Sequence, residues 1–288
     1  MKRILTIFLA LAFIMNADAF DRKKYNFNCG WKLKIGDVPS AMQTSYDDSD
    51  WKAVTLPNAF NEDEAFKLDI VDLTDTVVWY RKHFNVDEMT GRKFFIEFEG
   101  VRQAADFYIN GHHLGLHENG VMAVGFDLTP HIISGENVIA VRVDNDWKYR
   151  EKSSNARFQW NDKNFNANYG GIPKNVYLHV TSEVYQTLPL YSNLQTTGVY
   201  LYGTDYDIPS KKMILNAESQ VRNDSEMNVK LGMKSRFMMQ RERLSKLSKA
   251  KRFLWEQVRL LWSGHPPRSP VYISGVGDMD ICIWSRLF

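Results

Sequence analysis

Cysteine is scarce in this 288-residue sequence, and its charges nearly cancel. The two cysteines, Cys29 and Cys282, lie too far apart to suggest a zinc motif or a disulfide framework. The 36 Lys and Arg residues stand against 34 Asp and Glu residues, which leaves a formal net charge of +2. Because binding to phosphate groups needs a basic excess on one face, nucleic acid is not expected as a partner.

The sequence also lacks a hydrophobic run that could span a membrane, since a transmembrane helix needs about 20 apolar residues. The apolar run from Ile4 to Met15 is shorter; it follows Lys2 and Arg3 and precedes Ala17-Asp18-Ala19. Small residues after such a run are typical of a signal-peptidase site. Residues 1–19 are therefore predicted to be a signal peptide, cleaved near Ala19 to give a secreted or periplasmic protein. Membrane association is not expected.

Aromatic residues are abundant, at 13%, which suits a β-rich core or a surface that contacts carbohydrate. From Trp31 to Thr181, short alternating apolar runs are separated by Gly, Asn, Asp and Pro, a pattern that favours antiparallel strands. Asn110-Gly111 lies between two such runs and suits a tight hairpin turn. We predict an all-β fold whose first domain, residues 20–183, is a jelly-roll β-sandwich.

A second group of strands follows a break near residues 187–193. Residues 198–202, 213–219 and 229–237 have the alternation of the opening strands of an immunoglobulin-like sandwich. Since only opening strands are found, residues 184–237 are predicted to form an incomplete immunoglobulin-like domain.

Short motifs follow one another in a fixed order along residues 25–237. They are Tyr46-Asp47-Asp48-Ser49-Asp50-Trp51, Leu56-Pro57, Val78-Trp79-Tyr80-Arg81-Lys82, Phe98-Glu99-Gly100-Val101, Asn110-Gly111, Phe126-Asp127-Leu128-Thr129, Gly135-Glu136-Asn137 and Gly170-Gly171-Ile172. Together they resemble the sugar-binding domain of glycoside hydrolase family 2, which contains β-galactosidases, β-glucuronidases and β-mannosidases. The resemblance implies a jelly-roll domain, an immunoglobulin-like domain and then a catalytic (β/α)₈ barrel. Asn58 stands where the family usually has His after Leu-Pro.

Catalysis in that family depends on the barrel. A retaining glycosidase needs two carboxyl groups about 5–5.5 Å apart, and the resemblance implies two Glu residues at the ends of barrel strands. A barrel needs roughly 250 residues, and nothing after Phe237 has that length or pattern. Asn61-Glu62 is similar to the pair around the family's acid/base, but the adjacent Asp63 and Glu64 indicate a solvated loop. The chain is therefore predicted to be the non-catalytic N-terminal part of a β-galactosidase-type enzyme, with no catalytic residues.

The segment before Gly170-Gly171 supplies the candidate sugar-binding residues. It is rich in amide and carboxylate groups, which can pair with sugar hydroxyls, and in aromatic rings, which can stack on a pyranose. The resemblance implies that this loop reaches the barrel's active site and helps to bind the terminal sugar. The candidates are Asp162 and Asn164 first, then Asn161, Asn166 and Trp160. A turn whose Asn and Asp side chains bond their own backbone explains any single residue equally well.

Three histidines, His112, His113 and His117, raise the question of a metal site. They flank the predicted hairpin turn, and no Cys or carboxylate pair stands at metal-ligand spacing beside them. Neither a metal nor another cofactor is expected.

Residues 238–288 differ in character from the rest. Between Met238 and Trp262, apolar residues recur at near-helical spacing among many Lys and Arg, as in a basic amphipathic helix for an anionic membrane or a partner's groove. The loss of one base near the Phe237 codon is another explanation. Read from the third base of each codon, Phe237 to Glu242 can encode Tyr-Asp-Ala-Glu-Gly-Lys, which continues the preceding strand into a polar turn. Residues 238–288 are therefore predicted to be an out-of-frame tail.

Three classes of function stay open. The first is the sugar-binding part of a family 2 glycosidase without its barrel, and the second is a stand-alone carbohydrate-binding module; the partner of both is a β-linked glycan or oligosaccharide. The third is a membrane- or partner-binding protein that acts through the basic tail. Turnover of β-glycosides, glycan binding without turnover, and lipid binding that requires residues 238–288 would distinguish them.

Overall fold

The computed structural model describes residues 22–64, 67–69, 72–120, 122–156, 169–189, 192–209, 212–226, 228, 230–234, 259–260, 271–275 and 282–286. Strands dominate these residues, and short 3-10 turns occur at η1 (Pro39–Met42), η2 (Glu62–Glu64) and η4 (Ser192–Leu194). The predicted all-β fold is confirmed. Within the described ranges, no helix has the length and apolarity needed to cross a membrane.

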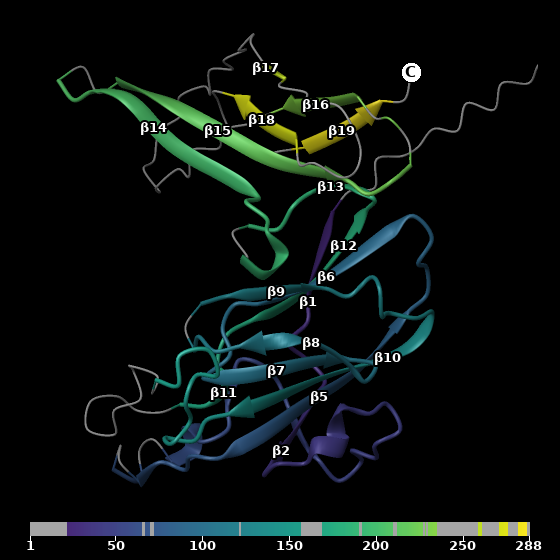
Figure 1. Cartoon of the computed structure of the whole chain (residues 1–288), viewed down its shortest axis with the longest axis vertical. Helices are drawn as coiled ribbons and strands as arrows, with labels where there is room; N and C mark the ends of the chain where they lie inside the picture. The colour runs from purple at the N-terminus through teal and green to yellow at the C-terminus, as the bar shows by residue number, and fades with distance from the viewer. Residues whose placement is uncertain are drawn as a thin grey trace, which may run out of the picture.

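Two antiparallel sheets form the jelly roll, which occupies the lower part of Figure 1. The six-stranded sheet has the order β3 (Lys52–Val54), β2 (Trp31–Ile35), β5 (Val77–Val86), β10 (Gly135–Asp144), β7 (Ala104–Ile109) and β8 (His112–His117). The four-stranded sheet has the order β1 (Lys23–Asn26), β12 (Val176–Ser182), β6 (Arg92–Phe98) and β9 (Val124–Asp127). A separate antiparallel pair joins β4 (Asn58–Ala59) to β11 (Gly171–Ile172).

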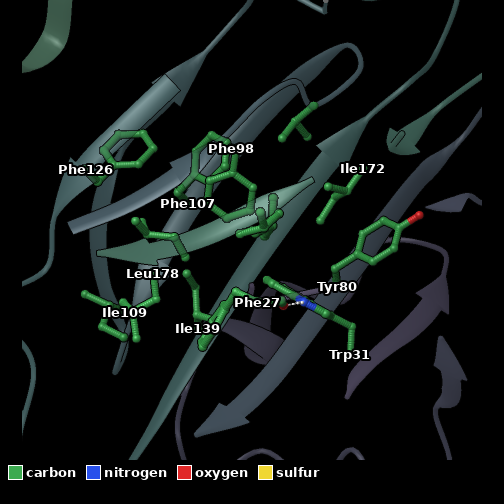
Figure 2. Close-up of a cluster of buried hydrophobic side chains, with 14 of the residues drawn as sticks. Phe27, Trp31, Tyr80, Phe98, Phe107, Ile109, Phe126, Ile139, Ile172 and Leu178 are labelled. Atoms are coloured by element: carbon green, nitrogen blue, oxygen red, sulfur yellow. Dashed lines mark hydrogen bonds between the residues drawn. The ribbon is translucent and has the colours of Figure 1, made fainter. Parts of the chain in front are cut away.

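The core lies between the two sheets and is rich in aromatic rings (Figure 2). Phe98 of β6 packs on Phe107 of β7 with ring centroids 4.8 Å apart, and Phe107 in turn packs on Phe126 of β9 at 4.7 Å. Trp31 is fully buried, and its indole Nε1 donates a hydrogen bond to the carbonyl of Phe27 at 2.8 Å. Strand alternation places these rings on one face of each sheet, so burying them fixes the register of the strands.

The remaining strands form two further sheets, in the upper part of Figure 1. One contains β13 (Val184–Gln186), β15 (Lys212–Asn223), β18 (Val271–Gly275) and β17 (Arg259–Leu260) in that order, with β14 (Val199–Asp207) also paired to β15. The other pairs β16 (Lys230–Lys234) with β19 (Cys282–Arg286). The proposed domain limits at residues 183 and 237 stay predictions.

The helical spacing of residues 238–262 does not produce a helix where the structure describes this segment. Arg259–Leu260 forms β17, which pairs with β18, and β18 pairs with β15. Pairing satisfies the backbone donors and acceptors through neighbouring strands, and tertiary context of this kind overrides a weak helical preference. The rest of the predicted helix lies outside the described residues, and the reading-frame hypothesis stays a prediction.

Candidate functional site

The five predicted sugar-binding residues lie outside the described part of the chain; these are Trp160, Asn161, Asp162, Asn164 and Asn166. The structure describes the residues on either side of them. The segment after β10 and the segment leading into β11 meet β4 and the β6–β7 connection at one end of the jelly roll (Figure 1). We call this group the end cluster; it consists of residues 58–61, 102–103, 145–147 and 170–171.

Gly171 brings β11 against the core. The buried hydroxyl of Tyr80 donates to Asn58, with its Oη 3.0 Å from Asn58 Oδ1 and 3.2 Å from the carbonyl oxygen. Gly171 has a φ of +114°, and a Cβ there would lie 2.3 Å from Tyr80 Oη. Only glycine fits both the dihedral angle and the space. Burial also raises the pKa of Tyr80, so this hydroxyl stays a proton donor.

Asn61 joins two segments of the end cluster to the chain that leads into β5. Its side chain is 1% exposed; Nδ2 donates to the carbonyl of Thr74 at 3.0 Å, and Oδ1 accepts from the Gly170 N–H at 3.2 Å. The neighbouring Glu62 is exposed at the start of η2, as the solvated-loop interpretation predicts. Asn61 is therefore a positioning residue that sequence reasoning treated only as part of a superficial motif.

Arg102 and Gln103 bring polar groups into the same cluster. The Arg102 backbone pairs with Gly171 through two hydrogen bonds of 2.9 Å, one in each direction. Gln103 is 1% exposed, and its Nε2 donates to the carbonyl of Asp146 at 3.1 Å. Within the described residues, Gln103 Oε1 and the Nε and Nη2 atoms of Arg102 are buried without a hydrogen-bond partner. Neither residue was predicted from the sequence, because a connection between two strands carries no sequence pattern that would indicate contact with the distant strand β11.

A carboxylate holds the chain after β10 to the same end. Glu118 Oε1 accepts a hydrogen bond of 2.6 Å from the Tyr149 hydroxyl and one of 2.7 Å from the Lys152 N–H. Burial and this carboxylate both raise the pKa of Tyr149. The side chains of the end cluster thus stand on a backbone that several independent contacts fix.

The three candidate histidines do not converge. His113 Nε2 lies 2.9 Å from Asp106 Oδ1, His117 Nε2 lies 3.2 Å from the carbonyl of Met122, and His112 stacks on His131. Among the described residues, no group of three or more His, Cys, Asp or Glu side chains is arranged so that it could hold a metal ion.

Amide and guanidinium groups predominate in the end cluster, and both kinds of group hydrogen-bond readily to hydroxyl and carboxylate oxygens. Jelly-roll sandwiches include lectin domains, as well as viral capsid domains and cupins. The fold and the end cluster therefore define a jelly-roll β-sandwich with a polar end that offers donors and acceptors to a hydroxyl-rich ligand.

The family is established by comparison with known proteins. The model of the glycosyl hydrolases family 2 sugar binding domain matches residues 19–182, so the chain belongs to glycoside hydrolase family 2, and the predicted resemblance is confirmed.

Two curated relatives and a solved structure define the extent of the likeness. The chain is 40% identical over 223 residues to a β-glucuronidase of Formosa agariphila and 31% identical over 215 residues to a β-galactosidase of Bacteroides ovatus. Each match covers 72% of this chain but only 22% and 23% of those relatives. A solved β-glucuronidase of family 2 is 36% identical with a TM-score of 0.63, and the match covers 75% of this chain and 23% of that one. The chain thus spans less than a quarter of these relatives.

Proposed function

We propose that this chain is the sugar-binding, non-catalytic N-terminal part of a family 2 enzyme of the β-galactosidase type. The observation that supports it best is the family match over residues 19–182 combined with coverage of less than a quarter of the matched relatives. In this proposal the two catalytic carboxylates belong to a barrel outside these 288 residues, and the chain alone does not hydrolyse glycosides. The predicted signal peptide would place the protein in the periplasm or outside the cell.

The end cluster supports a role in binding the terminal sugar. Asp162 and Asn164, with Asn161, Asn166 and Trp160, stay the proposed sugar contacts. They fall in sequence between two held segments: Glu118 holds the one that ends near Lys152, and Asn61 holds the one that begins at Gly170. A rigid base of this kind would reduce the entropy lost when the contacts engage a sugar.

A β-glucuronide is the second candidate substrate. The relative that is 40% identical and the solved structure that is 36% identical are both β-glucuronidases. A glucuronide differs from a galactoside in the configuration at C4 and in carrying a carboxylate at C6, and the carboxylate calls for a cationic partner in the site. Arg102 of the end cluster has the required charge.

Two measurements test the proposed function. The chain is assayed with chromogenic β-galactoside and β-glucuronide, and no turnover above the buffer rate is expected. The gene is then sequenced and one base is restored near codon 237. We expect the restored frame to continue into a barrel and its product to cleave one of the two substrates. Turnover by the 288-residue chain would refute the non-catalytic assignment, and a restored frame that soon ends would refute the out-of-frame tail.

A further inference from the structure

The first strand, β1, is attached to the jelly roll with little apolar burial. It lies at the end of the four-stranded sheet beside β12, and all four of its residues are exposed. Local opening is easiest in an element of this kind. Two cations of the segment, Arg22 just before the strand and Lys24 within it, reach side chains on the face of the sheet opposite to the core.

His179 of β12 and Glu97 of β6 form the buried pair that receives both cations. His179 is 3% exposed, and its Nε2 lies 2.7 Å from Glu97 Oε2. The guanidinium of Arg22 lies against the other ring nitrogen, with Nη2 3.1 Å and Nε 3.3 Å from His179 Nδ1. Lys24 Nζ lies 3.0 Å from the same Glu97 oxygen. The pair therefore connects both cations to β12 and β6.

These contacts define the protonation state of His179. A guanidinium has only donors, so Nδ1 must be unprotonated in order to accept from Arg22. An ionised carboxylate only accepts, so Nε2 carries the ring proton and donates to Glu97. Burial lowers the pKa of His179; Glu97 opposes this effect, and the positive charges of Arg22 and Lys24 add to it. The contact with Arg22 thus requires a neutral imidazole.

A second proton on the ring would turn the acceptor of Arg22 into a donor of like charge. The imidazolium would also compete with Lys24 for the shared oxygen of Glu97. Among the described residues, these three are the charged groups that act on the ring. Phe95 stands opposite it on β6, and β13 presents the carbonyl of Gln186, 3.5 Å from the Nη1 atom of Arg22. Neither of these uncharged groups compensates for the added charge.

We propose that His179 is an acid-sensitive latch for β1, in which a proton entering at Nδ1 releases Arg22 and loosens the strand from β12. The proton comes from solvent and stays on the ring, where Glu97 balances its charge. β1 is then held mainly by its backbone pairing with β12. Opening β1 uncovers the edge of β12, whose free backbone groups can pair with another strand. The latch does not depend on the proposed glycan-binding function.

Nuclear magnetic resonance of the imidazole nitrogens tests the protonation state in the full chain. The chain is labelled with nitrogen-15, and the ring of His179 is assigned through its backbone. At about pH 8, the shifts should show an unprotonated Nδ1 and a protonated Nε2. As the pH is lowered to about 5, the Nδ1 signal should move to the protonated position.

Hydrogen exchange, read by mass spectrometry and corrected for the intrinsic effect of pH, measures the opening of β1. Between about pH 8 and about pH 5, protection of residues 23–26 should fall about tenfold, because a hydrogen bond from a charged group is lost. β9, at the other edge of the same sheet, should keep its protection to within about twofold. Asp48, with a pKa of about 2, stays ionised over this range.

His179→Gln separates the latch from other effects of acid. The glutamine amide can still donate to Glu97 but does not titrate, so protection of β1 should change less than about twofold between the same pH values. His113→Gln is the matched control. It removes an exposed histidine of the other sheet, whose Nε2 lies 2.9 Å from Asp106 Oδ1, and it should keep the full acid response of β1.

Three results would overturn the inference. The first is a His179 ring that carries a proton on Nδ1 at about pH 8. The second is a parallel loss of protection in β1 and β9, and the third is an undiminished acid response of β1 in His179→Gln. If His179→Gln does not fold, the ring titration and the comparison of β1 with β9 in the unsubstituted chain decide the question.

Discussion

Asp48 and Arg81 form the ion pair on which a buried part of the jelly roll depends. Arg81 is fully buried, and the side chain of Asp48 is 6% exposed. Removing one partner of such a pair leaves an uncompensated charge, so Asp48→Asn should lower the free energy of unfolding by about 3 kcal/mol. Asp50→Asn is the matched control, because its ion pair with Lys34 is exposed to solvent and should contribute far less. Urea unfolding measures both variants, and equal losses would contradict the assigned role of Asp48.

The same carboxylate predicts an acid-labile fold. Burial opposes ionisation of Asp48, but hydrogen bonds from Lys32, Arg81 and His83 outweigh burial and lower its pKa to about 2. In the unfolded chain the pKa of this Asp is about 4. The ionised Asp48 therefore stabilises the fold by about 2 kcal/mol above about pH 4, and this stabilisation disappears as the pH falls to about 2. Urea unfolding measured between about pH 5 and about pH 2 should show this loss of unfolding free energy in the unsubstituted chain. The free energy of Asp48→Asn should depend less on pH over the same range. Parallel profiles would show that other carboxylates cause the loss.

At the scale of single elements, the two-residue strand β11 depends on glycine. Gly171→Ala would introduce a Cβ at a φ of +114°, 2.3 Å from Tyr80 Oη and 3.0 Å from the Asn58 carbonyl oxygen. Gly36→Ala is the matched control, since its φ is +104° and a Cβ there would meet nothing within 4 Å. In both variants the positive φ should lower the free energy of unfolding by about 1 kcal/mol. In Gly171→Ala the clash should lower it by about 1–3 kcal/mol more. Equal unfolding free energies in urea would show that the clash relaxes freely.

Some elements could be predicted from local sequence, whereas others depend on distant partners. The hairpin at Asn110-Gly111 is confirmed: both residues have positive φ, 49° and 83°, and they join β7 to β8. The positive dihedrals that Asn-Gly favours make such a turn visible in the sequence. β4 and β11 give no periodic signal because each has two residues. The groups of the end cluster near Arg102 were missed for the same reason, since only the pairing of β4 with β11 brings them together.

At the scale of the whole molecule, order in the sequence motifs predicted the family, and the core explains why. Residues of the motifs, such as Tyr80, Phe98 and Phe126, are buried in one cluster between the sheets, so their spacing records a shared packing arrangement. The second group of strands was harder to predict, because three of its strands belong to residues 238–288, which were predicted to be an out-of-frame tail, and one of the three lies within the stretch from Met238 to Trp262 that has near-helical spacing. These strands form through pairing with segments that lie far away in the sequence, which local sequence patterns do not reveal.

The two groups of strands should differ in resistance to proteolysis. The jelly roll buries a continuous core, whereas β14 and the turn after it expose Tyr200, Tyr206 and Ile208, with exposed fractions of 54%, 66% and 83%. Cleavage follows local opening, which is easiest where few apolar contacts are buried. Brief digestion followed by mass spectrometry should therefore cut first between residues 199 and 234 and leave a fragment that contains the whole jelly roll and ends at the first of these cuts. Phe98→Ala, which removes a fully buried ring, should abolish the resistance of that fragment without slowing the first cuts. Survival of residues 199–234 for as long as the jelly roll would instead mean that both groups open as one cooperative unit.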